Sequence, residues 1–228
     1  MTTWHDASGN GRDASQANAI KLPQLQSATP LPGTGAALEW VQFSPGTGLG
    51  HTDGQDLDVD LSFLTNSDYT IVALVSRYGD TWLSNNQEGN YFIGAGVLTS
   101  QNNSLPYGAL HAGWYTDTDF RFSEFGNDAD ANVPPNPVGS WQAQLVTCRF
   151  SKQNGRTIYL DGNLAAFVSD TTPLNAADQG AVGRGFLNDH ASNQFSGGIA
   201  ELLVYSEALG DVDRAAVESF LRTKWQAP

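Results

Sequence analysis

Residues 195–205 read Phe-Ser-Gly-Gly-Ile-Ala-Glu-Leu-Leu-Val-Tyr, which is an almost continuous apolar run. A strand with one exposed face alternates apolar and polar residues, whereas a strand covered on both faces is apolar throughout. The run therefore predicts a strand at the centre of a sheet.

A helix is expected directly after this strand. It should open near residues 209–211, because Asp211 and Asp213 then lie in the first turn and interact favourably with the positive end of the helix dipole. The apolar side chains that share one face at helical spacing are Val217, Phe220, Leu221 and Trp225. This face, Phe220 included, is predicted to pack on the rest of the domain.

The remaining chain alternates short apolar segments with turn-rich segments, as an all-β domain does. The predicted strands cover residues 37–43, 57–61, 69–77, 91–94, 110–115, 120–125, 144–150, 156–161 and 164–168. Asn154-Gly155 supplies the positive φ that a hairpin turn needs. The spacing of the segments between residues 91 and 125 predicts a meander.

Composition limits the possible partners. Lys and Arg number 11 against 24 Asp and Glu, so the net charge is −13, which repels nucleic-acid phosphates. The apolar runs are too short for the ~20 residues that span a bilayer, so no membrane insertion is expected. Abundant Asp with few cations is typical of extracellular modules, although an acidic cytosolic protein has a similar composition. We expect a module that is secreted or displayed at the cell surface. We also expect a monomer. The lone Cys148 lies on a predicted strand and is expected to be a buried, inert thiol.

Several short motifs occur in a recognisable order. They are Trp4-x-Asp6-x-Ser8-Gly9-Asn10-Gly11, Tyr159-Leu160-Asp161-Gly162, Val182-Gly183-Arg184, Gly198 to Tyr205 with Ala208-Leu209, and Val217-Glu218-x-Phe220-Leu221-x-x-Lys224-Trp225. Together they resemble the bacterial LamG-like, concanavalin A-like lectin/glucanase modules of surface adhesins and secreted polysaccharide-active proteins. The resemblance implies one jelly-roll sandwich of two curved antiparallel sheets over residues 1–228, with a short C-terminal helix. Such modules bind glycans or ions, or act as spacers.

The sequence carries no recognisable catalytic set. Glucanases that share this fold use a Glu-x-Asp-x-(x)-Glu strand, in which paired carboxylates act as nucleophile and general acid. No glutamate here has an aspartate two residues further on, and Glu124, on a predicted strand, is interpreted as a solvated charge. We therefore expect a non-catalytic module, with a degenerate glucanase-like enzyme as the distant alternative.

Calcium is the expected cofactor, because glycine-rich acidic loops gather the oxygen ligands that it prefers. Asp6 and Asn10 offer such ligands, and the resemblance places Glu201 close to their loop. The alternative, which we rate equally, is that Asp6 only caps backbone amides in an Asx turn. Further candidates, for which a solvated acidic loop is the favoured interpretation, are Asp53, Asp56, Asp58 and Asp60, and Asn127, Asp128 and Asp130.

Glycan binding requires exposed aromatic rings beside amides or carboxylates. The residues that fit this requirement are Trp82, Asn86, Tyr107, Trp114 and Tyr115. Because Trp114 and Tyr115 alternate along a strand, only one of them can face a concave sheet. Trp40, Trp141 and Trp225 are assigned to the core. Two functions remain open: a carbohydrate-binding module, and a structural spacer that positions neighbouring domains of the same polypeptide.

Overall fold

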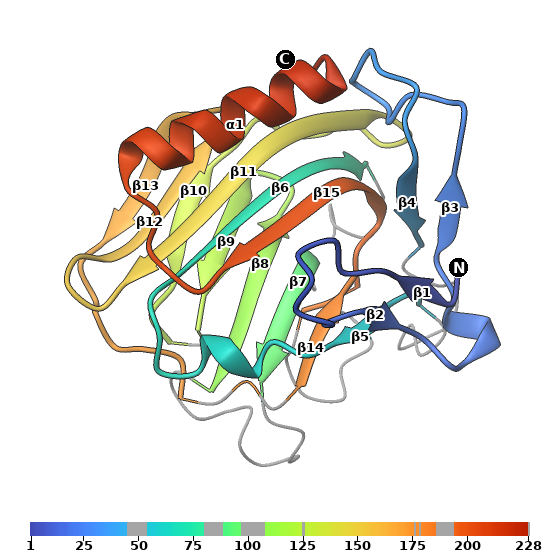
Figure 1. The fold of residues 1–228 in the computed structure, drawn as a ribbon. Coiled ribbons are helices and arrows are strands. Elements are labelled where there is room, and N and C mark those ends of the chain that lie inside the picture. The colour runs from blue at the N-terminus through green and yellow to red at the C-terminus, as the bar shows by residue number, and fades with distance from the viewer. Residues whose placement is uncertain are drawn as a thin grey trace.

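Two antiparallel sheets face each other across a common hydrophobic core (Figure 1). The computed structural model describes residues 1–44, 54–79, 89–96, 108–124, 126–175, 177, 179–185 and 194–227. In these ranges one sheet has eight strands and the other has seven. None of the described helices is long and apolar enough to cross a membrane. The all-β prediction is confirmed.

The eight-stranded sheet contains, in spatial order, β1 (Thr3–Trp4), β2 (Ala14–Ser15), β5 (Leu57–Val59), β14 (Gln179–Val182), β7 (Asn90–Gly96), β8 (Ala109–Thr116), β9 (Asp119–Ser123) and β10 (Ala129–Asn132). The seven-stranded sheet contains β13 (Asn163–Val168), β12 (Gly155–Leu160), β11 (Trp141–Ser151), β6 (Tyr69–Tyr78), β15 (Gly197–Tyr205), β4 (Trp40–Phe43) and β3 (Gln24–Gln26). Two short 3-10 helices, η1 (Ala19–Lys21) and η2 (Ser62–Leu64), lie in connections. The helix α1 (Asp211–Trp225) follows β15.

Turn residues and apolar segments in the sequence predict most of these strands near their observed positions. The neighbours β7, β8, β9 and β10 follow chain order, which confirms the predicted meander. Gly155 has a φ of 96° in the turn between β11 and β12, as the Asn-Gly pair predicts. The next turn places Asp161 and Gly162 at φ values of 51° and 80°.

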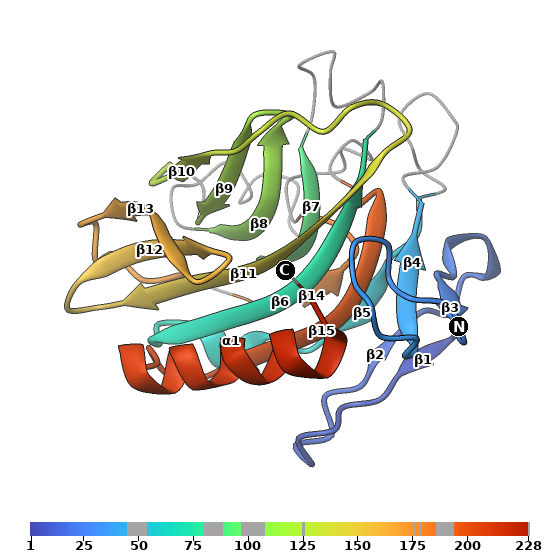
Figure 2. The same cartoon turned by 90° about the horizontal axis from the view of Figure 1, so that it is seen from above.

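The strand β6 forms the middle of the molecule because both of its faces are covered. It pairs with β11 from Tyr69↔Phe150 to Tyr78↔Trp141. Ile71 and Val75 face the core between the sheets, whereas Val72 and Leu74 face the helix. Figure 2 shows α1 on one side of the seven-stranded sheet and β7 to β10 on the other.

The predicted central position of residues 195–205 holds for only part of the strand. Gly197 to Ile199 pair with both β4 and β6. A register shift follows Ile199, and Glu201 to Tyr205 pair with β6. Among the described strands, none pairs with the other edge of this half of β15.

The helix is observed where it is expected, but the prediction that Phe220 seals the sandwich is wrong. The buried side chains are Arg214, Glu218, Leu221 and Trp225, and Phe220 is 60% exposed. Spacings of three and four residues place these four on one stripe, with Phe220 on its flank. The polar members are buried because Glu218 accepts hydrogen bonds from Thr147 Oγ1 at 2.7 Å and Arg214 Nη1 at 2.6 Å.

Leu221→Ala is expected to lower the free energy of unfolding by ~2–5 kcal/mol, because it empties a fully buried site. Phe220→Ala, one position earlier, should cost below ~1 kcal/mol, since most of that ring is in solvent. Chemical denaturation of both variants checks the assignment. Equal losses in the two variants would contradict the observed face of α1.

Candidate functional site

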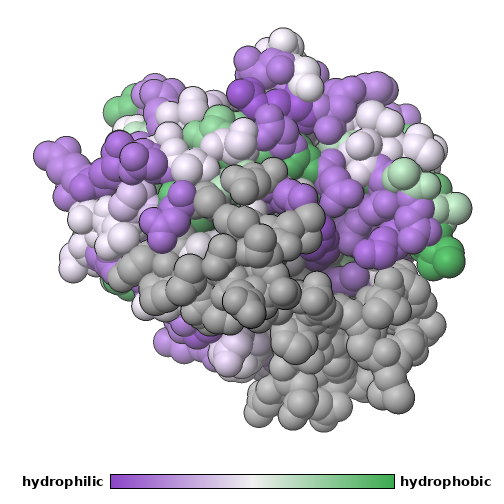
Figure 3. Space-filling model, turned by 90° about the horizontal axis from the view of Figure 1, so that it is seen from below, coloured by the Kyte–Doolittle hydropathy of each residue, from purple (hydrophilic) through white to green (hydrophobic). Residues whose placement is uncertain are grey.

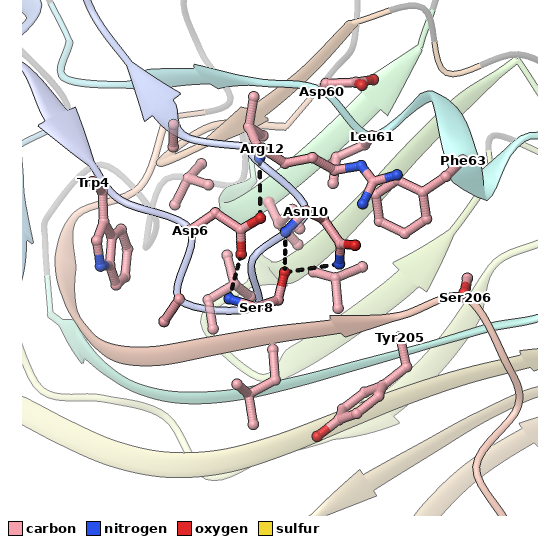
Figure 4. A pocket seen from close by; sticks show the side chains of 18 of the residues that line it. Trp4, Asp6, Ser8, Asn10, Arg12, Asp60, Leu61, Phe63, Tyr205 and Ser206 are labelled. Atoms are coloured by element: carbon pink, nitrogen blue, oxygen red, sulfur yellow. Dashed lines mark hydrogen bonds between the residues drawn. The ribbon is translucent and has the colours of Figure 1, made fainter.

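A cleft of about 690 Å³ opens between residues 5–12 and the second half of β15 (Figure 4). Its apolar lining comes from both sheets and includes Val59, Leu61, Ile93, Val182, Leu202 and Val204. Its polar lining includes Asp6, Asn10, Arg12, Asp60, Ser206 and Glu207. The cleft thus combines an apolar interior with a mostly acidic rim.

The loop above the cleft is held together by its own hydrogen bonds (Figure 4). Asp6 Oδ1 accepts from the Ser8 N–H at 2.8 Å, and Asp6 Oδ2 accepts from the Arg12 N–H at 3.0 Å. A hydrogen bond from the Ser8 side chain, followed by those from the backbone of Arg12 and Ser8, lowers the pKa of Asp6 to about 2. The amide of Asn10 donates to Ser8 Oγ at 2.8 Å. These contacts are those of the Asx turn that the sequence offered as an alternative.

Glu201 lines the same cleft as Asp6 and Asn10, and its part in a calcium site stays a prediction. The Glu201 carboxylate accepts hydrogen bonds from Lys224 Nζ and from Trp225 Nε1, the latter at 3.2 Å, so it is directed toward the helix. In the described ranges, no group of three His, Cys, Asp or Glu side chains could hold a metal ion. Calcium requires six to eight oxygens, so amide, backbone carbonyl or water oxygens would have to complete a site at this loop.

Two of the other acidic candidates, Asp56 and Asp58, are engaged by cations, whereas Asp60 accepts a hydrogen bond from the Ser62 N–H at 2.9 Å. Asp56 is buried and accepts from Gln16 Nε2 at 2.5 Å and pairs with Arg184 Nε at 3.1 Å. Asp58 also pairs with Arg184, at 3.3 Å. Burial raises the pKa of Asp56, although the charges of Arg184 and Lys21 oppose this rise. Asp53 lies outside the described residues.

A second polar surface lies on the outer side of the eight-stranded sheet. We call it the Tyr115 face, and its residues are Tyr115, Arg121, Asp128 and Asp130. The Arg121 guanidinium lies 3.8 Å from the centre of the Tyr115 ring. It also forms two hydrogen bonds with Asp130, at 2.7 and 2.8 Å, and pairs with Asp128 at 3.0 Å. Arg121 therefore fixes one ring and two carboxylates in a single arrangement.

Two buried rings, Tyr91 and His111, lie close enough to Arg121 and Asp128 for those charges to act on them. The Tyr91 and His111 rings are 4.7 Å apart, and both side chains are almost fully buried. Burial lowers the pKa of His111 to about 4 and raises the pKa of Tyr91. His111 is therefore neutral near pH 7, and its Nδ1 has no hydrogen-bond partner within the described part of the chain. The charge of the Tyr115 face comes from Arg121 and from the carboxylates of Asp128 and Asp130.

The family is settled by a sequence comparison. The family model of the concanavalin A-like lectin/glucanases superfamily matches residues 49–213, which is most of the chain. This chain belongs to that superfamily. The two observed sheets and the C-terminal helix agree with its jelly-roll sandwich. No curated protein matches the chain in sequence.

Solved structures with the same superfamily fold are distant in sequence. Domain 4 of AbnA, an extracellular arabinanase from Geobacillus stearothermophilus in complex with arabinotriose, is 14% identical, with a TM-score of 0.62 over 93% of this chain and 91% of that one. The CBM40 of a Ruminococcus gnavus sialidase, bound to α2,6-sialyllactose, is 17% identical, with a TM-score of 0.54 over 67% and 83% of the two chains. At these identities the likeness shows the fold.

A third match is a botulinum neurotoxin type C structure, in a study of its interaction with two ganglioside molecules. It is 13% identical, with a TM-score of 0.56 over 97% of this chain and 51% of the toxin chain. The present chain therefore spans about half the length of that toxin chain.

The superfamily includes glucanases, but Glu124 is not the solvated charge that the sequence suggested. It is fully buried, pairs with Arg156, and accepts a hydrogen bond from Tyr69 Oη at 2.5 Å. The interpretation failed because both partners come from the opposite sheet, far away in sequence. A carboxylate enclosed in this way is a structural residue.

The structure places the residues that were predicted to bind a glycan in different environments. Trp114 is fully buried, with its ring packed near Phe120 and Phe195, so its assignment to a glycan surface is wrong. Tyr115, the next residue, is 44% exposed on the opposite side of the strand. Trp82, Asn86 and Tyr107 lie outside the described residues. Arg121 was not among the predicted site residues, although the alternation Phe120-Arg121-Phe122 places it on the same outer side as Tyr115.

Proposed function

We propose that this chain is a non-catalytic glycan-binding module and that the Tyr115 face is its binding surface. The observation that carries the proposal is the exposed Tyr115 ring, fixed by Arg121 beside the carboxylates of Asp128 and Asp130. An aromatic ring stacks on the C–H face of a sugar, and carboxylates accept hydrogen bonds from its hydroxyl groups. The ion pairs hold these groups in place before a ligand arrives, which reduces the entropic cost of binding.

Two further observations agree with a polar ligand. The side of the molecule drawn in Figure 3 is mainly hydrophilic where residues are described. Two fold neighbours are carbohydrate complexes, with arabinotriose and with sialyllactose. One of them belongs to an extracellular enzyme, which supports the proposal that this module acts outside the cell or at its surface. We also propose that the module is monomeric.

Binding to a glycan array is the first test of the proposal. Tyr115→Ala should weaken binding about tenfold or more, equivalent to about 1.4 kcal/mol, because it removes the stacking ring. Phe220→Ala is the matched control, since it removes an exposed ring from the helix. Asp130→Asn should also weaken binding without unfolding the protein.

An array without any bound glycan would contradict the proposal and favour the alternative, a spacer that positions neighbouring domains of the same polypeptide. Equal affinity of Tyr115→Ala and the unmodified chain would exclude the Tyr115 face as the binding surface. Turnover of a bound polysaccharide would contradict the non-catalytic assignment.

Calcium stabilisation stays a prediction, and a variant of the N-terminal loop separates its two explanations. If Asp6 acts only through its hydrogen bonds to Ser8 and Arg12, then Asp6→Ala lowers the melting temperature equally in calcium and in chelator. We expect this result from the observed geometry. If Asp6 binds calcium, the unmodified chain melts higher in millimolar calcium than in chelator or magnesium, and Asp6→Ala removes the difference.

A further inference from the structure

Every nitrogen of the Arg121 guanidinium is already engaged at the Tyr115 face. Nε and Nη2 donate to the two oxygens of Asp130 at 2.7 and 2.8 Å, and Nη1 lies 3.0 Å from Asp128 Oδ2. The contact with Asp130 follows from the strand register, because the two residues are directly opposite each other on β9 and β10. One face of the guanidinium lies over the Tyr115 ring. Arg121 therefore orders the surface, but none of its nitrogens lacks a carboxylate partner.

A ligand at this face meets the carboxylates more readily than the guanidinium. The side chains of Asp128 and Asp130 are 33% and 41% exposed, whereas that of Arg121 is 16% exposed. Proteins commonly recognise a carboxylate through two parallel hydrogen bonds from arginine. Here Asp130 already occupies that geometry, so the carboxylate of a sugar would have to displace it.

The face carries more negative than positive charge. Arg121 is the one cation among its four residues, against the carboxylates of Asp128 and Asp130. Alternation along β9 places Asp119 on the same outer side, where it accepts a hydrogen bond from Thr116 Oγ1 at 2.6 Å. The whole chain has a net charge of −13. An anionic sugar would therefore meet charges of its own sign.

The hydrogen-bonding capacity that remains on the two aspartates is that of acceptors. An ionised carboxylate only accepts hydrogen bonds, at about four lone-pair sites. Asp130 uses one site on each oxygen for Arg121, and Asp128 accepts from Arg121 on Oδ2 and from Ser123 Oγ on Oδ1. The hydroxyl groups of a sugar can fill the remaining sites. A sugar carboxylate cannot, because it has no hydrogen to donate.

We propose that the Tyr115 face selects uncharged glycans and rejects those whose bound sugar carries a carboxylate. This inference rests on the proposed function, because it concerns the ligand of the same surface. The fold does not decide the question, since the CBM40 of the Ruminococcus gnavus sialidase is bound to α2,6-sialyllactose, an acidic glycan. The charges and hydrogen bonds of this face favour the opposite class.

The test is a glycan array of matched forms. Oligosaccharides of glucose, galactose, mannose and arabinose are each printed as the neutral sugar, as the carboxylate made by oxidising primary hydroxyl groups, and as the methyl ester of that carboxylate. α2,6-Sialyllactose and its methyl ester are printed beside them. The carboxylate of a recognised oligosaccharide should bind about tenfold or more weakly than its ester. The difference should shrink in about 1 M salt, where the screening length falls to about 3 Å.

A double variant assigns the selectivity to the face. Asp128→Asn with Asp130→Asn changes the charge of the four residues from −1, with one arginine and two aspartates, to +1, and releases Arg121. Binding of neutral sugars should fall, while the affinity of the carboxylate relative to its ester should rise about tenfold or more. Glu39→Gln with Asp213→Asn is the matched control, because it removes two exposed charges from the part of the chain that forms the seven-stranded sheet and its helix. It should leave that ratio unchanged.

The inference is overturned if the carboxylate binds as tightly as its ester, or if free α2,6-sialyllactose is the strongest ligand. Equal losses for the carboxylate and its ester would also overturn it, because size and not charge would then exclude them. The same holds if the control pair shifts the ratio as much as the aspartate pair. Absence of binding to every form would contradict glycan binding itself, which distinguishes failure of the proposed function from failure of this selectivity.

Discussion

The ion pair between Glu124 and Arg156 fixes the two sheets to each other in the middle of an apolar interior. Glu124 follows β9 in one sheet, and Arg156 lies on β12 in the other. Both side chains are fully buried, and Arg156 also donates to the carbonyl oxygens of Asp170 and Thr172 at 2.9 and 2.7 Å. Leaving one buried charge without its partner costs ~3–5 kcal/mol, so the sheets cannot slide here without a large loss of stability.

Burial has the largest effect on the pKa of Glu124 in this pair. It raises the pKa of Glu124 to about 7, although the charge of Arg156 and hydrogen bonds from Tyr69 and Arg156 oppose the rise. The contact anchors the chain directly after β9. Strand alternation in β9, which pairs with β8, turns Phe120 and Phe122 inward and Arg121 outward. The ion pair and the Tyr115 face thus lie on opposite sides of the same sheet.

The sequence could predict the features that depend on neighbouring residues. Asn154-Gly155 forms its turn, residues 57–61 alternate as expected, and Trp40 and Trp225 are buried. The errors concern residues whose partners are distant in the chain. Glu124 is engaged by Arg156 across the core, and the Trp114 ring stacks near that of Phe195. Local periodicity assigns a side to each residue, but it does not show which residues meet on that side.

The most direct test of glycan recognition at the Tyr115 face is a map of backbone amide chemical shifts during titration with a glycan that binds on the array. The expected shifts cluster on β8, β9 and β10 around Tyr115, Arg121 and Asp130, and the amides of residues 5–12 and 201–207 stay unchanged. Shifts that cluster on the cleft, with β8 to β10 unaffected, would contradict the assignment of glycan binding to the Tyr115 face.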